Sequence, residues 1–274
     1  MRKIGINAEL GFDFTTEEMI KKIKAAGFDA IFTGWGKGAP ISEWKALADS
    51  LGLEYTFIHA PFGSIEKMWD EGDAGDDYLK LLCDCIDDCA ANSIPIMICH
   101  VFKGFGEEHP NALGVTRFEK LLDYAEAKNI TVAFENTEGE SYLDLLMTEL
   151  ADKKSLGFCI DTGHEMCYNY SKDLIGKYAG KLVATHLNDN LGILGESIFW
   201  LDDLHLLPFD GICDFKGVAE RIKKTDFNST LMFELTVNSK PGRNENDKYK
   251  AMGVDAYLDE AYKRASKCAS FFEN

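Results

Sequence analysis

The sequence predicts a single α/β domain that spans residues 1–274 and folds as a (β/α)8 TIM barrel. Eight short apolar runs alternate along the chain with longer amphipathic stretches, the pattern of repeated strand and helix units. A barrel of this kind needs about 250 residues, so the length suits one such domain. Because no Pro-rich or Ser-rich linker interrupts the chain, we expect one domain.

The apolar runs predict the strands. Several are β-branched and apolar nearly throughout, as expected of parallel strands that are covered on both faces. The runs are KIGINAE (3–9), AIFTGW (30–35), EYTFIHA (54–60), IPIMICHV (94–101), ITVAFEN (130–136), LGFCIDT (156–162), KLVATHLND (181–189) and TLMFELT (230–236). A doubly wound sheet is the alternative, but no G-x-G-x-x-G fingerprint follows the first run, which argues against a dinucleotide-binding sheet.

The stretches between the runs predict helices. The first, from Thr15 to Ala26, opens with a capping box, because Glu18 follows Thr15 by three residues. It is expected to end at Gly27, which tolerates the left-handed conformation found after helices. Residues 76–91, 116–128 and 214–224 have similar apolar periodicity with charged outer faces and predict further helices.

The charge balance limits the classes of partner. The chain carries 46 acidic and 29 basic residues, a formal net charge of −17. Only five residues are arginine, and nowhere do basic residues cluster with aromatic ones. Proteins that bind nucleic acid need a basic surface to neutralise phosphates, so extended contact with DNA or RNA is disfavoured. The net charge does not exclude a local basic pocket, because it describes the whole surface rather than one site.

Hydropathy and cysteine placement predict a cytoplasmic protein. No apolar run approaches the roughly 20 residues of a membrane helix, and the start MRKIGINAEL lacks the pattern of a signal peptide. Eight cysteines are present, three of them (Cys83, Cys85 and Cys89) in one helical stretch, and none forms a C-x-x-C pair. We therefore expect small buried apolar side chains rather than disulfides or a structural zinc site.

Residues that bind metals or transfer protons gather at the strand ends. The last six predicted strands end on or near one such residue each: His59, His100, Glu135, Asp161, His186 and Glu234. In a barrel those ends meet at one mouth, where the active site is expected. Buried carboxylates and imidazoles are costly without a partner, and a metal ion supplies the missing positive charge. We therefore predict a divalent-metal site.

Five segments resemble the signatures of one superfamily in order and spacing. AFEN, CIDTGH, THLNDN, DLHLLPFDG and FEL are similar to motifs of the xylose-isomerase-like TIM barrels. That superfamily contains sugar and sugar-phosphate isomerases and epimerases, and nucleases of the endonuclease IV type that act at abasic sites. The resemblance covers residues 54–237.

The epimerase branch implies one Mn²⁺, Mg²⁺, Co²⁺ or Zn²⁺ ion held by Glu135, Asp161, His186 and Glu234. Mixed carboxylate and imidazole ligands do not specify the metal. By the same resemblance, Glu135 and Glu234 would be catalytic, moving a proton next to a carbonyl from opposite sides. His164 matches a histidine that contacts the substrate.

The nuclease branch implies up to three zinc ions held by nine residues, and every one of the nine finds a match of the same type. The matches are His59, His100, Glu135, Asp161, His164, His186, Asp203, His205 and Glu234. However, the D-x-H motif formed here by Asp203 and His205 also occurs in sugar isomerase-like members. The loop after His59 becomes acidic, which does not suit DNA. Its Met68 and Trp69 are expected to be exposed and to cover a small-molecule pocket.

The substrate is expected to be a small sugar or polyol, with His59, His100, His164 and Trp69 around it. An arginine that some epimerases carry after the seventh strand has no counterpart in LNDNLGILGES. If the substrate is phosphorylated, Lys240 and Arg243 after the eighth strand are the candidates to bind the phosphate.

We therefore predict a metal-dependent sugar or sugar-phosphate isomerase or epimerase. A three-metal phosphoesterase and a sugar-binding barrel without activity stay as alternatives. Phe271 and Phe272 suggest a homo-oligomer contact.

Overall fold

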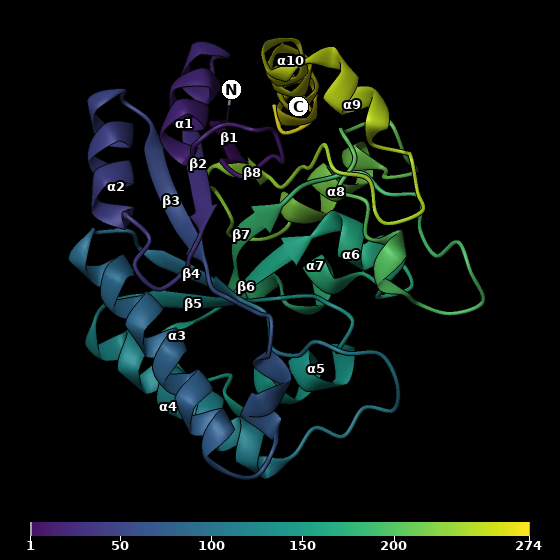
Figure 1. The fold of residues 1–274 in the computed structure, drawn as a ribbon. Helices are drawn as coiled ribbons and strands as arrows, with labels where there is room; N and C mark the ends of the chain where they lie inside the picture. Colours follow the sequence, from purple (N-terminus) through teal and green to yellow (C-terminus); the bar gives the residue numbers. More distant parts are fainter. Residues whose placement is uncertain (1, 274) are drawn as a thin grey trace.

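Eight strands, each parallel to its neighbours, run around a nearly closed barrel in a computed structural model that describes residues 2–273 (Figure 1). They are β1 (Ile4–Asn7), β2 (Ala30–Gly34), β3 (Glu54–His59), β4 (Ile96–Cys99), β5 (Thr131–Glu135), β6 (Leu156–Asp161), β7 (Leu182–His186) and β8 (Leu231–Phe233). Seven ladders join them in the order β7-β6-β5-β4-β3-β2-β1-β8. Between β7 and β8 the barrel closes through one bridge, in which Leu187 N donates to Met232 O at 2.8 Å. The predicted single-domain barrel is confirmed.

Helices connect the strands and lie on the outside of the barrel (Figure 1). They are α1 (Thr16–Ala25), α2 (Ile41–Ser50), α3 (Asp73–Ala91), α4 (Ala112–Ala127), α5 (Glu140–Glu149), α6 (Thr162–Cys167), α7 (Leu174–Lys177), α8 (Phe215–Ile222), α9 (Asp247–Met252) and α10 (Val254–Ser270), with 3-10 turns η1 (Ile65–Trp69), η2 (Ala179–Lys181) and η3 (Trp200–Asp202). Among the described helices, none is long and apolar enough to cross a membrane.

The ends of the helices follow local chemistry. The capping box of α1 is confirmed: the side chain of Thr15 accepts from Glu18 N, and the side chain of Glu18 accepts from Thr15 N. Gly27, just past this helix, has a φ of +102°, as expected of a residue that ends a helix. Helix α4 begins four residues earlier than predicted, because the side chain of Asn111 caps it by accepting from Gly114 N at 3.0 Å.

The barrel interior combines large and small side chains. The large side chains in the interior are Phe32, Phe57, Ile98 and Met232, and they pack against alanines and Cys159. The ring of Phe32 stacks on the imidazole of His186 with centroids 4.9 Å apart, so this core supports the mouth of the barrel from below. All eight cysteines are free thiols and six are buried, as predicted.

Phe271 and Phe272 pack against the core of their own chain, and the Arg2 guanidinium lies 4.9 Å from the Phe272 ring centroid. Each ring is therefore partly covered by its own chain, and an oligomer stays a prediction.

Candidate metal centre

The strand ends bring four predicted metal ligands together. Glu135, Asp161 and His186 are the last residues of β5, β6 and β7, and Glu234 directly follows β8. One ligand atom from each lies within 4.8 Å of the others. The Nδ1 atom of His186 is 2.8 Å from Glu135 Oε1 and 3.4 Å from Glu234 Oε2. The first three residues are fully buried, while the side chain of Glu234 is 22% exposed. This group could hold one divalent ion.

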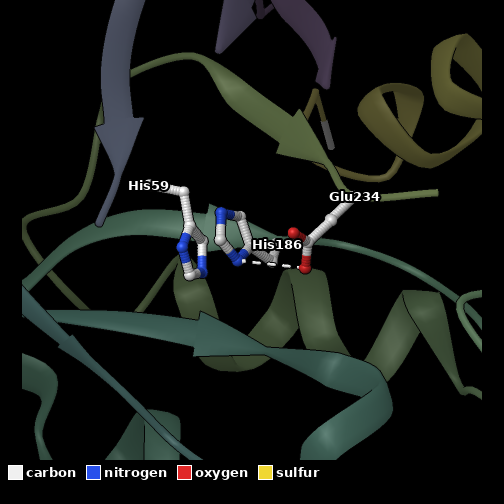
Figure 2. A group of neighbouring side chains, drawn as sticks. All are labelled: His59, His186 and Glu234. Atoms are coloured by element: carbon white, nitrogen blue, oxygen red, sulfur yellow. Dashed lines mark ion pairs between the residues drawn. The ribbon is translucent and has the colours of Figure 1, made fainter. Parts of the chain in front are cut away.

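Two further histidines share the carboxylate of Glu135. His59 ends β3 and His100 directly follows β4, and the Nε2 atom of each lies 3.2 Å from Glu135 Oε2. Figure 2 shows His59, His186 and Glu234 facing one another from three separate strand ends, with the His59 and His186 rings stacked at 5.8 Å. These three side chains form another group able to hold an ion, as do His59, His100 and Glu135.

His164 and His205 form a metal-capable group with Asp161, and both also contact Asp203. The Oδ1 atom of Asp203 lies 2.8 Å from His205 Nε2 and 3.3 Å from His164 Nε2. This buried oxygen has no hydrogen bond of acceptable geometry within residues 2–273. His205 has a φ of +47°, a left-handed conformation that costs a non-glycine residue roughly 1–2 kcal/mol. The fold thus holds an unfavourable backbone at the point where the three side chains meet.

The histidine tautomers test whether this set suits a metal ion. The Nδ1 atoms of His59, His164 and His205 lie 2.8, 2.9 and 3.2 Å from the carbonyl oxygens of Ala60, Asn136 and Glu234. A carbonyl oxygen only accepts, so each Nδ1 carries a proton, and each Nε2 of the neutral ring presents a lone pair. These Nε2 atoms face carboxylate oxygens at 2.8–3.3 Å, a contact that is favourable only when a second proton on the ring donates to the carboxylate or when a metal ion accepts the lone pair. Metal-binding histidines show this arrangement, so the residues fit a divalent ion.

The motifs around Asp161 hold its carboxylate in place. Its Oδ1 accepts from His164 N at 2.7 Å, and its Oδ2 accepts from Asn188 Nδ2 at 2.8 Å. Its backbone N–H donates to Asn136 Oδ1 at 2.7 Å. A Cβ on Gly163 would lie 2.0 Å from Asn188 Oδ1, so only glycine fits there. The asparagines that follow β5 and β7 therefore position Asp161, a predicted ligand at the end of β6.

Buried carboxylates in the site respond differently to their neighbours. Burial raises the pKa of Asp161 to about 6, although His164 and His205 act in the opposite direction. Burial also favours the protonated form of Glu135, but the imidazoles of His186, His100 and His59 outweigh it and hold the pKa well below its usual range. Whether these buried carboxylates are ionised therefore depends on the positively charged groups beside them.

A cavity of about 610 Å³ opens above these residues. It is lined by His59, Phe62, Gly63, Glu66, His100, Lys103, Gly104, Phe105, Glu138, His164, Tyr168, Trp200, Asp203, His205, Glu234 and Lys240. The side chain of Glu234 lines this cavity, whereas Glu135 does not line it. No sequence pattern pointed to five of these lining residues, because loop residues carry no periodic signal: Phe62, Phe105, Glu138, Tyr168 and Trp200. The available hint was that each lies in a segment that follows a strand end.

Two predicted substrate contacts lie elsewhere. Trp69 is buried with 5% exposed, and its Nε1 donates to Val101 O at 2.7 Å. Met68 is fully buried as well, so the expected exposed pair was wrong: η1 turns both side chains into the core. Arg243 pairs with Asp202 and Glu245 outside the cavity. Lys240 does line the cavity, with its Nζ 3.0 Å from Asp203 Oδ2.

A family model described as "xylose isomerase-like TIM barrel" matches residues 20–253, most of the chain. The chain belongs to this family. A protein named y4fM of Sinorhizobium fredii (strain NBRC 101917 / NGR234), described as uncharacterised, is 29% identical over 175 residues, which cover 58% of this chain. The chain spans about half the length of that relative, with 53% covered.

Solved structures of sugar epimerases have the same fold. A D-psicose 3-epimerase from Clostridium cellulolyticum H10, solved with D-tagatose, is 15% identical, with a TM-score of 0.72 and 99% of each chain covered. An L-ribulose 3-epimerase is 16% identical, with a TM-score of 0.73 and coverage of 100% of this chain and 95% of the other. At these identities the likeness establishes the barrel architecture and leaves the reaction to be argued from the site.

Proposed function

We propose that this protein is a divalent-metal-dependent isomerase or epimerase of a small sugar, sugar phosphate or related polyol, acting by proton transfer next to a carbonyl. The observation that carries the proposal is the placement of Glu234. Its carboxylate lies 3.4 Å from His186 in the metal-capable group and also lines the cavity. Membership of the xylose isomerase-like family and the fold shared with ketose epimerases support the same reaction class.

Glu135, Asp161, His186 and Glu234 are the residues that would hold the metal. A bound divalent ion supplies Lewis-acid polarisation of the substrate's carbonyl and hydroxyl oxygens. Burial favours the neutral form of Glu234, but His186 and His205 outweigh it and lower the pKa, so the carboxylate is ionised and able to accept a proton. His59, His100 and His164 line the same cavity and are placed to orient the oxygens of a sugar.

The accessibility of Glu135 bears on whether the site can perform isomerisation or epimerisation. An isomerase needs one base that returns the proton on the same face, whereas an epimerase needs groups on both faces. Glu234 lines the cavity, but Glu135 is fully buried, with its oxygens engaged by four imidazoles. This geometry favours Glu234 as the residue that moves the proton. Epimerisation further requires Glu135 to become accessible when substrate binds.

Solvent exchange tests the reaction. The metal-loaded protein is incubated in deuterated water with a panel of ketoses and ketose phosphates, and deuterium incorporation is followed by NMR. We expect deuterium at the carbon next to the carbonyl of at least one sugar. Glu234→Gln should abolish exchange, and metal content is measured beside it to separate a lost base from a lost ion. No incorporation across the panel, with metal bound, would contradict the proposal.

A phosphoesterase of the abasic-site nuclease type is the second candidate, because several overlapping groups able to hold metal lie at the strand ends. Beside the group of Glu135, Asp161, His186 and Glu234, they are His59–His186–Glu234, His59–His100–Glu135 and Asp161–His164–His205. The net charge of −17 opposes binding to duplex DNA. Elemental analysis near three zinc ions per chain, together with incision of a duplex containing one abasic site at low salt, would establish this activity. Metal-dependent sugar binding without exchange or incision would instead indicate an inactive barrel.

A further inference from the structure

A second hollow continues the cavity above the metal-capable residues. It measures about 650 Å³, against about 610 Å³ for the first. Phe105, Glu138 and Tyr168 line both hollows and therefore form the boundary between them. The first hollow is already at the scale of pockets that take drug-sized ligands, so the two together extend well beyond a single monosaccharide.

The boundary is a preformed aromatic wall. The ring of Phe105 is 41% exposed and lies between Tyr168 and Phe199, with centroids 6.0 and 5.8 Å away. Phe199 in turn contacts Trp200, which lines the first hollow. Aromatic faces pack well against the C–H faces of sugar rings, and rings held by one another lose little freedom when a ligand binds.

Glu138 adds an unsatisfied polar group at the same boundary. The residue is only 8% exposed, and its Oε1 accepts from Gly104 N at 3.0 Å. Within residues 2–273, its second carboxylate oxygen has neither a hydrogen-bond nor an ion-pair partner. Because Glu138 lines both hollows, this oxygen is free to accept a hydrogen bond from a ligand hydroxyl that spans them.

The second hollow selects against negative charge. It is lined by Glu108, Glu140, Asp144 and one lysine, Lys172, whose Nζ already pairs with Glu140 at 2.8 Å. Tyr170, which is 60% exposed, provides an aromatic face on the same hollow. Carboxylates accept hydrogen bonds from hydroxyl groups and repel phosphates and uronates, so this lining suits a polyhydroxylated group without negative charge.

We propose that the site takes a glycoside rather than a free monosaccharide. The reacting sugar occupies the first hollow above Glu234, and a second, non-anionic sugar residue crosses the boundary at Phe105 into the second hollow. This inference rests on the proposed function for the reacting sugar, but binding in the second hollow is measurable without turnover.

Calorimetric titration of the Mn²⁺-loaded protein tests the proposal. The ligands are fructose, fructose 6-phosphate, and the ketose disaccharides lactulose and maltulose. We expect at least one disaccharide to bind about fivefold or more tightly than fructose, and fructose 6-phosphate to gain no such advantage. Tyr170→Ala should weaken disaccharide binding by about two- to tenfold and leave fructose binding unchanged. The matched control is Phe14→Ala, which removes an exposed ring that lines neither hollow.

The outcomes distinguish this inference from the proposed function. If neither disaccharide binds more tightly than fructose, or if Tyr170→Ala behaves like Phe14→Ala, the second subsite is refuted, whether or not fructose exchanges deuterium. If disaccharide binding depends on Tyr170 but no ligand exchanges deuterium, the subsite stands and the isomerase proposal falls.

Discussion

Replacing Asn188 with alanine tests whether the residues after β7 hold Asp161, a predicted metal ligand, in place. Asn188 is fully buried, and its Nδ2 donates to Asp161 Oδ2 at 2.8 Å. A hydrogen bond to a charged group contributes about 1.5–3 kcal/mol. The backbone groups of Asn188 keep their bonds to Thr162 Oγ1, so the change affects mainly the side chain. At about 2–4 °C per kcal/mol for a domain near this size, we expect the Tm to fall by about 3–12 °C.

The second consequence concerns the metal. Loss of a side chain that orients a ligand lowers metal affinity by about 10- to 100-fold, which calorimetric titration with Mn²⁺ and Zn²⁺ measures. Ser155→Ala is the matched control, because Ser155 Oγ donates to Leu122 O at 2.7 Å beside the opposite end of β6. It should lower the free energy of unfolding by about 1 kcal/mol and leave metal affinity intact. Wild-type metal affinity in Asn188→Ala, or equal losses in both variants, would refute the reasoning.

Four further substitutions separate metal binding, helix capping, core packing and the lining of the cavity. Gly163→Ala would place a Cβ 2.0 Å from Asn188 Oδ1, so metal affinity should fall; titration giving wild-type affinity would show that the asparagine is free to move. Thr15→Ala removes the cap of α1 and should cost about 1 kcal/mol by scanning calorimetry, and an unchanged Tm would mean that packing alone holds the helix. Trp69→Ala should cost about 3–5 kcal/mol with little change in KM, whereas Trp200→Ala should raise KM with a small change in Tm. The reverse pattern would contradict their placement in the core and in the cavity.

Local patterns account for the parts of the fold that were predicted correctly. The eight apolar runs became strands, and the Thr15–Glu18 capping box formed as written, because both depend on neighbours within a few residues. The start of α4 was placed four residues late, because its cap, Asn111, precedes the periodic apolar positions. The sequence also predicted that Glu135, Asp161 and His186 lie close together. They end three predicted parallel strands, and the carboxyl ends of such strands meet at one mouth of the barrel.

The environment of each site residue could not be predicted in the same way. Trp69 and Trp200 both lie in loops after strands, and nothing in their local sequence separates them. The turn η1 packs Trp69 into the core against Gly114 of α4, whereas Trp200 stays 41% exposed at the cavity. Side-chain burial in loops depends on contacts between distant segments, which no local pattern encodes.

By itself, the sequence determined the barrel and the strand ends at which its predicted metal ligands stand. Only the tertiary structure decided that Glu135 is buried while Glu234 reaches the cavity, that His164 and His205 meet at Asp203, and that a second hollow opens beyond Phe105. Strand periodicity is a property of adjacent residues, whereas access to a cavity is set by how loops from separate strands pack over one mouth.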